Sequence, residues 1–162
     1  MAVSERATKL TLAGAFLGGL GAFSALLQRR DETVQMQPLD LVMLGLATYR
    51  SGRLVAYERV AAPLREPVTS TIPDGSGVGE TVVADGEGWR WALGELVSCP
   101  VCIGTWVAAG LVYGLHLAPT PTRVYITIMG ATGIAQLLSE TTEALSWSSR
   151  SARRQAAPPG QV

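Results

Sequence analysis

The sequence has little charge and few aromatic side chains. Charged residues make up 16% of its 162 residues, against about 25% in an average soluble domain, and the mean hydropathy is positive. The 13 basic and 13 acidic residues cancel, so the chain lacks the positive field that attracts phosphates. Aromatic residues, at 6%, leave few side chains on which bases stack. We therefore expect no nucleic-acid partner, and lipid as the solvent for part of a one-domain chain.

Cysteine and histidine are also scarce. The chain has two cysteines and one histidine, His116. Two cysteines cannot form a framework of disulfides, and one histidine cannot supply a histidine-based metal centre or a repeated catalytic pair. We therefore expect no catalytic residues, no cofactor and no bound metal, which disfavours most hydrolase chemistry.

The chain contains long runs of residues without a charge. Residues 10–27 form a run of 18 residues without a charge, bounded by Lys9 and by Arg29. As a helix this run is about 27 Å long, enough to cross the hydrocarbon core of a bilayer. We interpret it as a membrane span. A secretory signal peptide is the alternative, because residues 22–24 resemble a small-residue cleavage site.

Within this first run, Gly14, Gly18 and Ala22 are spaced four residues apart. That spacing puts three small residues on one face of a helix, where a second helix backbone can approach closely. The alternative is chance spacing in a glycine-rich span. We take the three residues as a candidate helix-packing face toward another chain or a second copy.

Two further uncharged runs cover residues 101–117 and 124–138, and residues 118–123 between them contain Pro119 and Pro121. The prolines lack backbone donors and prevent one helix from continuing through this stretch. The two runs therefore predict a helical hairpin in the membrane. Residues 39–62 are harder to interpret, because Arg50, Gly52 and Arg53 interrupt their apolar pattern.

In residues 39–62, helical spacing puts Asp40, Ala47, Ser51 and Glu58 on one face. That pattern favours a helix in the interface, or folded against the spans, over a fourth crossing. We thus expect an all-α integral membrane protein with three transmembrane helices, four being possible, an interfacial helix and a small polar insert. The expected organisation is a span and linker at 1–37, a membrane domain at 38–147 and a disordered tail at 148–162.

The polar insert covers residues 63–88 and is rich in glycine and proline. Residues 68–72 and 81–84 favour β structure and bracket a turn-rich centre, so we expect a short hairpin. Ten of the 13 basic residues fall on the side of this insert and the C-terminus in either topology, so both are expected in the cytoplasm. The side of the N-terminus stays open.

Cys99 and Cys102 lie three residues apart at the start of the second run, separated by Pro100 and Val101. Proline favours the first position of a helix, so Cys99 is the expected N-cap and both sulfurs share a face. Three interpretations are open: packed small residues, a redox thiol pair, or half of a metal site completed by another chain. In the reducing cytosol a permanent disulfide is not expected.

Charges close to lipid usually pair with one another. We expect Asp40 or Glu95 to pair with Arg50 or Arg53 in the folded chain. The alternative is a proton or ion pathway, for which the sequence has too few charges within its apolar runs.

Several short stretches carry a family resemblance. They are Asp40, Leu-Ala-Thr-Tyr-Arg at 46–50, Pro-Leu-Arg-Glu-Pro at 63–67 and, most specifically, Gly-Glu-Leu-Val-Ser-Cys-Pro-Val-Cys at 94–102. With these, residues 39–144 resemble the uncharacterised bacterial membrane proteins called domain of unknown function 1360. The sequence departs from that pattern at Val101, where the family usually has Phe, and at residues 133–135, where an acidic residue is expected. The resemblance implies the bacterial cell membrane as location and no reaction.

From these observations we expect a multi-pass membrane protein that acts as a structural, assembly or interaction subunit. Its partners would be membrane lipid and other membrane protein chains or a second copy of itself. The alternative is a membrane-tethered thiol redox or metal-binding protein that uses Cys99 and Cys102.

Overall fold

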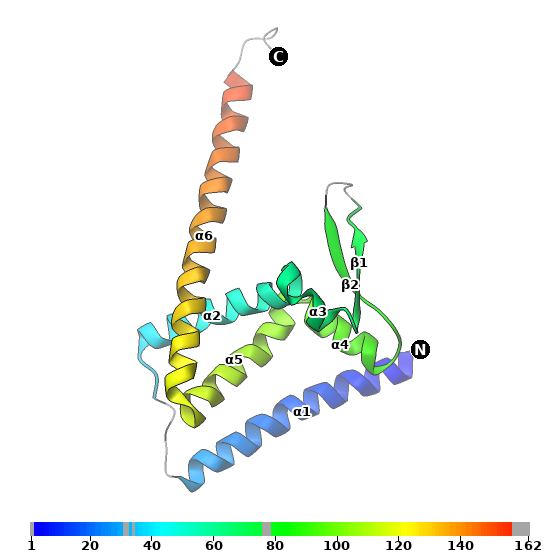
Figure 1. Ribbon diagram of the computed structural model, residues 1–162, viewed down its shortest axis with the longest axis vertical. Helices are drawn as coiled ribbons and strands as arrows, with labels where there is room; N and C mark the ends of the chain where they lie inside the picture. The colour runs from blue at the N-terminus through cyan, green and yellow to red at the C-terminus, as the bar shows by residue number, and fades with distance from the viewer. Residues whose placement is uncertain (1, 31–32, 34, 76–78, 157–162) are drawn as a thin grey trace.

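The computed structural model describes residues 2–30, 33, 35–75 and 79–156, without the side chains of 2–5 and 151–156. The chain is mostly helical, and a two-stranded sheet projects at one side beside the helix α4, Trp89–Ser98 (Figure 1). The elements follow in the order α1 Ala2–Arg29, α2 Pro38–Tyr57, the 3-10 turn η1 Arg59–Ala61, α3 Ala62–Arg65, β1 Thr69–Pro73, β2 Glu80–Ala84, α4 Trp89–Ser98, α5 Pro100–Leu117 and α6 Pro119–Ala156.

Helix α1 covers the whole first apolar run and packs along α5. The ring of Phe16 lies 5.2 Å from that of Trp106, and the ring of Phe23 lies 4.3 Å from that of Tyr113. The earlier residue of α1, Phe16, contacts the earlier residue of α5, and the later residue contacts the later one. Helices α1 and α5 therefore run in the same direction. Figure 1 shows α1 along the edge of the molecule away from the projecting part of α6.

Helix α2 packs against α5 and α6, with its most extensive contacts on α6. Leu44 and Ala47 of α2 form the core together with Leu111 of α5 and Ile126 of α6. Helix α2 therefore lies against two other long helices of the chain.

Ala47 and Ser51, two of the four residues that the sequence places on one face of α2, are buried. The Ser51 hydroxyl donates to the carbonyl oxygen of Ala47 at 2.7 Å and lies 2.8 Å from the hydroxyl of Tyr125. These bonds satisfy the serine inside the protein, and the small side chains allow α6 to come close.

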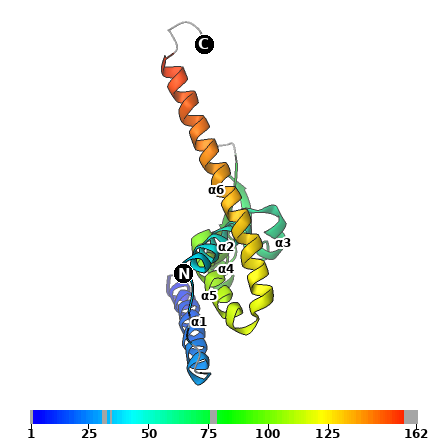
Figure 2. The same ribbon diagram turned by 90° about the vertical axis from the view of Figure 1, so that its left-hand side faces the viewer.

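Helices α5 and α6 form the predicted helical hairpin. Helix α5 ends at Leu117, and both prolines lie in the first turn of α6, where a missing N–H costs no helical hydrogen bond. Helix α6 then continues for 38 residues. Its distal part projects beyond the other elements in both views (Figures 1 and 2).

The expectation of a disordered tail at 148–162 is wrong for residues 148–156, which continue α6. Serine hydroxyls there bond back to carbonyl oxygens three residues earlier, as Ser148 does to Leu145 and Ser149 to Ser146. The next proline after Pro121 is Pro158, so nothing in 148–156 lacks a backbone donor. Residues 157–162 lie outside the described residues.

The predicted hairpin is present in the polar insert. Strands β1 and β2 pair antiparallel, with Thr69 opposite Ala84 and Pro73 opposite Glu80. The hairpin packs on α4, where Gly94 lies against the carbonyl of Val68. It projects toward the same end of the molecule as the distal part of α6 (Figure 1).

Within the described residues, two helices are long and apolar enough to cross a membrane, α1 over Arg6–Arg29 and α5 over Pro100–Leu117. The third expected span, in α6, is not among them. Its apolar stretch is short because Arg123 precedes it and Ser139 and Glu140 follow it. The structure is thus mostly helical, as expected from the sequence, and two of its described helices are long and apolar enough to cross a membrane.

Candidate functional site

A tight turn that carries both cysteines joins α4 to α5. Cys99 is the C-cap of α4 and the N-cap of α5, and Pro100 occupies the first position of α5. The backbone N–H of Cys102 donates to Cys99 Sγ at 3.3 Å. This local geometry is the helix start that the cysteine and proline spacing predicts.

The two cysteines are joined by a disulfide, Cys99–Cys102, whereas the sequence led us to expect reduced thiols. The expectation considered only the redox state of the cytosol. The helix start adds a geometric factor, because it holds the two Cα atoms 5.2 Å apart, within the usual range for a disulfide. Among the residues that the structure describes, no group of three or more His, Cys, Asp or Glu side chains is placed to hold a metal.

Helix α2 passes directly over this cysteine turn. A Cβ placed on Gly52 would lie 2.5 Å from the carbonyl oxygen of Pro100, so only glycine permits this approach. Beside the contact, a groove of about 500 Å³ opens between α2 and α5. Arg53 stacks at its rim, with its guanidinium carbon 5.7 Å from the rings of both Tyr49 and Tyr57.

The charged residues singled out from the sequence pair differently from the expectation. Lys9 of α1 pairs with Glu95 at 2.8 Å and lies 4.9 Å from the ring centre of Trp91. Arg53 pairs with Glu140 of α6 at 3.2 Å. Tyr49 also donates to Glu140, at 3.3 Å.

Arg50 pairs with Glu58, whose backbone has left the helix. Glu58 is extended, so its carboxylate can turn back along the last turns of α2. The expected pairing of Asp40 or Glu95 with Arg50 or Arg53 is therefore wrong. Asp40 lies near one end of α2 and both arginines near the other, and Glu95 faces α1. Within the described residues, Asp40 takes part in no ion pair.

Sequence reasoning missed the partners Lys9, Glu58 and Glu140. Lys9 and Glu140 each lie at the end of an apolar run, which is the signal that could have identified them, whereas Glu58 directly follows α2. Charges that end neighbouring spans lie at one boundary of the membrane and can meet there. Which charges meet depends on helix direction, and this appears only in the folded chain.

Asp40 lines a cavity of about 270 Å³ between α2, α5 and α6. His116, Arg123 and Thr127 also line it, together with Gln35 and four apolar residues, Met36, Met43, Leu115 and Ile126. We call this space the Asp40 cavity. It lies at the end of α5 opposite the cysteine turn.

The candidate packing residues Gly14, Gly18 and Ala22 lie on a free face of α1. Nothing approaches within 4 Å of a Cβ built on Gly14 or Gly18, and Ala22 is exposed. Phe16 and Phe23, which contact α5, project from the opposite side of the helix. Among the described residues, the space beside Gly14 and Gly18 is therefore open, and Ala22 is accessible.

Comparison with known proteins identifies relatives of this chain. The family described as "Protein of unknown function (DUF1360)" matches residues 43–142. The protein named "Sporulation protein YjcA" of Bacillus subtilis (strain 168) is 33% identical over 104 residues, which cover 62% of this chain and 87% of that protein. No solved structure matches the chain. The matched region includes the cysteine turn, the ion pairs of α2 and most of the Asp40 cavity, and it begins after α1.

Proposed function

The chain belongs to the family described as protein of unknown function DUF1360, and from this premise we propose that it is a multi-pass protein of the bacterial cell membrane that acts as an assembly or interaction subunit. Its partners would be membrane lipid and other membrane protein chains or a second copy. The observation that carries the proposal is the exposure of its apolar helices.

Very little of the apolar surface of α1 and α5 is covered by the chain itself. In the most apolar 18-residue stretch of α1 only 6% is buried, and in that of α5 only 11% is buried. Leu10 is 73% exposed and Val101 is 78% exposed. Exposed apolar surface of this extent needs lipid or a partner chain, because contact with water is unfavourable.

The direction of the helices favours four crossings over the three that the sequence suggests. If α1 and α5 both cross, they cross in the same direction, because Phe16 meets Trp106 and Phe23 meets Tyr113. The chain must therefore return between them. Helix α2 makes that return, since Asp40 lies beside the end of α5, at His116, and Gly52 lies beside its start, at Pro100. Helix α6 is then the fourth crossing.

Two levels of charge support these crossings. Lys9, Arg53, Glu95 and Glu140 meet at one level, through the pairs Lys9–Glu95 and Arg53–Glu140. The other level contains Asp40, His116 and Arg123, which line one cavity. Along α6 the levels are 17 residues apart, from Arg123 to Glu140. At 1.5 Å per residue this is about 25 Å, close to the thickness of a hydrocarbon core.

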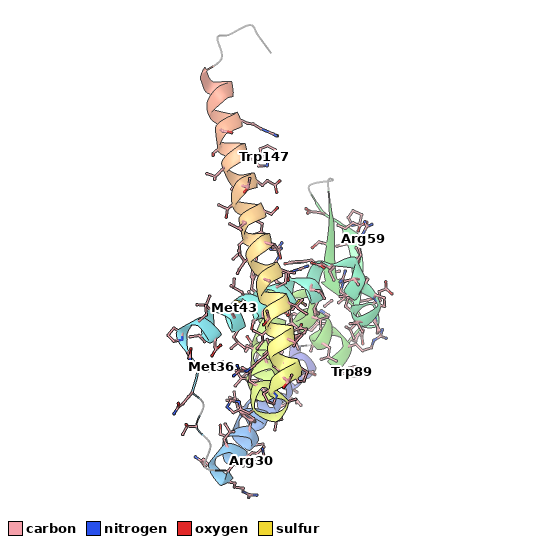
Figure 3. All side chains as sticks on the ribbon, turned by 60° about the vertical axis from the view of Figure 1, so that its left-hand side comes forward. Arg30, Met36, Met43, Arg59, Trp89 and Trp147 are labelled. Atoms are coloured by element: carbon pink, nitrogen blue, oxygen red, sulfur yellow. A yellow bond between two sulfur atoms is a disulfide. The ribbon has the colours of Figure 1, made fainter. Side chains whose placement is uncertain are left out.

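In this arrangement the hairpin, the N-terminus and the C-terminus share one side. That side also has most of the basic residues, so we assign it to the cytoplasm. Figure 3 shows Arg30 at the opposite end of the molecule from Arg59 and Trp147, as the assignment requires.

Partner binding is assigned to the face of α1 that carries Gly14, Gly18 and Ala22. In lipid, helices associate through close van der Waals packing, and small residues permit it. The residues are exposed and lie opposite the aromatic contacts with α5, so a second helix could reach them without displacing α5.

The test is capture between two differently tagged copies of the full chain in native membranes, with lipid-soluble crosslinking. Gly18→Leu should lower self-capture, or capture of the other membrane chains that co-purify, severalfold. Ala13→Leu adds the same kind of side chain on a neighbouring exposed face and should leave capture unchanged. Equal capture by wild type and both variants would remove this face from the proposal.

The disulfide supports a second candidate function, thiol redox exchange at the membrane boundary. Cys102 is exposed at the helix start, so an incoming thiolate could attack one sulfur of the pair. Exchange with an external dithiol would transfer two electrons and two protons, leaving two thiols here and one disulfide in the dithiol.

Thiol trapping in intact cells separates the two candidates. A redox protein should show both oxidised and reduced forms, with proportions that follow the thiol state of the growth medium. A subunit in which the pair only packs should keep one form in all media.

A further inference from the structure

The Asp40 cavity lies at the extracytoplasmic level of the proposed membrane arrangement and is built from four segments of the chain. The stretch before α2 contributes Gln35 and Met36, α2 contributes Asp40 and Met43, and the end of α5 contributes His116. The first turns of α6 supply the remaining wall, including Arg123. Segments far apart in sequence thus bring one carboxylate, one imidazole and one guanidinium to a single space.

No ion pair among the described residues uses the charges of this cavity. In the described part of the molecule, Lys9, Arg50 and Arg53 each have a carboxylate partner, whereas no ion pair joins Arg123 to Asp40. Both side chains line the cavity all the same. Each therefore has hydrogen-bonding capacity that a ligand can use.

His116 is held in one orientation at the wall. Its Nδ1 lies 2.9 Å from the carbonyl oxygen of Val112, so Nδ1 carries the hydrogen and donates. In the tautomer that carries its hydrogen on Nδ1, Nε2 is the acceptor. The ring of Phe23 in α1 packs edge-on against the imidazole, with the ring centres 5.5 Å apart.

The rest of the lining is apolar and continuous with the core. Ile126 is a core residue, and Met36, Met43 and Leu115 pack against that core. Figure 3 shows Met36 and Met43 on the same side of the molecule, at the start of α2. The cavity thus offers separated opposite charges beside an apolar wall.

We infer that the Asp40 cavity binds a zwitterionic group with a phosphoester and a primary ammonium, supplied by a phosphatidylethanolamine headgroup. Arg123 binds the phosphate, Asp40 and His116 accept from the ammonium, and the apolar wall covers the glycerol end of the lipid. Asp40 would repel a simple anion, and Arg123 would repel a simple cation. This inference rests on the proposed membrane location, which places the cavity at the level of headgroups.

The single histidine makes the test specific. The full chain is purified in a neutral detergent with its histidine ring labelled with ¹⁵N, so that every imidazole signal comes from His116. Dihexanoyl phosphatidylethanolamine is titrated against dihexanoyl phosphatidylglycerol and against free phosphoethanolamine. The ethanolamine lipid should shift the His116 signals saturably, with an affinity at least about tenfold above that of the glycerol lipid, because only the former satisfies Asp40.

Substitutions at the two charged residues separate their roles. Asp40→Asn should abolish the preference for the ethanolamine lipid, and Arg123→Gln should weaken both lipids by about tenfold or more. Arg29→Gln removes a charge at the end of α1, outside the cavity lining, and should bind as wild type. Circular dichroism confirms that the variants fold.

Free phosphoethanolamine identifies the source of the ligand. Weaker binding than that of the lipid supports the lipid, and equal binding assigns the cavity to a soluble zwitterion. Absence of a saturable shift with either, or Arg123→Gln binding as wild type, overturns the inference. Extraction of membranes with alkaline carbonate tests the proposed function separately. A chain that stays in the membrane and shows no shift contradicts the cavity inference alone.

Discussion

Single glycines determine how closely the elements of this molecule approach. A Cβ on Gly52 would lie 2.5 Å from the Pro100 carbonyl oxygen, and a Cβ on Gly94 would overlap the Val68 carbonyl and lie 3.0 Å from Ala84. The two carbonyl oxygens belong to the backbone and cannot rotate away as a side chain can. These two glycines hold α2 on the cysteine turn and the hairpin on α4.

Gly52→Ala and Gly94→Ala should each lower the free energy of unfolding by about 1–3 kcal/mol, because the added methyl group overpacks the contact. Gly110→Ala is the matched control. It lies within α5 with nothing inside 4 Å of its Cβ, so alanine should raise stability by up to about 1 kcal/mol. Thermal unfolding in detergent, followed by circular dichroism, measures all three. Equal midpoints for Gly52→Ala and Gly110→Ala would contradict the close approach.

Replacement of both cysteines by alanine tests whether the cysteine turn does more than pack. If it only packs, Cys99→Ala with Cys102→Ala should lower stability by about 1–2 kcal/mol and leave expression and partner capture intact. Serine replacements serve as the polar control. Loss of partner capture with normal folding would favour the redox candidate.

At the scale of elements, α2 is tied to α6 by a small polar cluster. Glu140 of α6 accepts from Tyr49 and pairs with Arg53, both on α2. The side chains of Arg53 and Glu140 are 36% and 45% exposed, so water and salt weaken the ion pair. Because the exposed ion pair adds little stability, its main effect is on geometry: it joins the last turns of α2 to the middle of α6.

A double-mutant cycle on Arg53→Gln and Glu140→Gln should give a coupling energy of about 0.2–1 kcal/mol that falls as salt rises. Its measurement is denaturant unfolding at low and high ionic strength. Arg59→Gln combined with Glu140→Gln is the control pair, since no ion pair joins Arg59 to Glu140, and it should be additive. A salt-independent coupling would show that packing, and not charge, links the helices.

At the scale of the whole molecule, the parallel course of α1 and α5 connects helix packing to membrane topology. Four crossings put both termini and the hairpin on one side and residues 30–37 on the other. Three crossings would put the N-terminus on the side opposite the hairpin. The two arrangements differ only in which side of the membrane each end of α1 occupies. Labelling from one side of the membrane can therefore distinguish them.

Single cysteines introduced at Thr33 and at Thr71, each in a chain whose native cysteines are replaced by alanine, test this arrangement. A membrane-impermeant maleimide added to intact cells should label position 33 and leave position 71 unlabelled until the cells are opened. Fluorescent-protein fusions at the N- and C-termini should both be fluorescent in the cytoplasm. Labelling of position 71 in intact cells would reverse the orientation, and protection of position 33 would restore three crossings.

Local features of the fold could be predicted from the sequence because local forces produce them. The uncharged run at 10–27 formed a helix, the prolines at 119 and 121 began α6 directly after the end of α5, and two β-prone stretches formed the hairpin. Proline after Cys99 predicted the helix start. The prediction of a disordered tail was wrong for residues 148–156. There α6, which begins in an apolar stretch, continues without a break into serines and arginines.

By itself, then, the sequence determined the apolar runs, the breaks between them, the helix start at the cysteines and the family to which the chain belongs. Only the tertiary structure decided which charges pair, which face of α2 is buried, and that Asp40, His116 and Arg123 line one cavity. The reason is physical. Helix formation depends on neighbours within a few residues, whereas pairings between helices depend on their relative direction and on close contacts such as Gly52 with Pro100, which join positions about 50 residues apart.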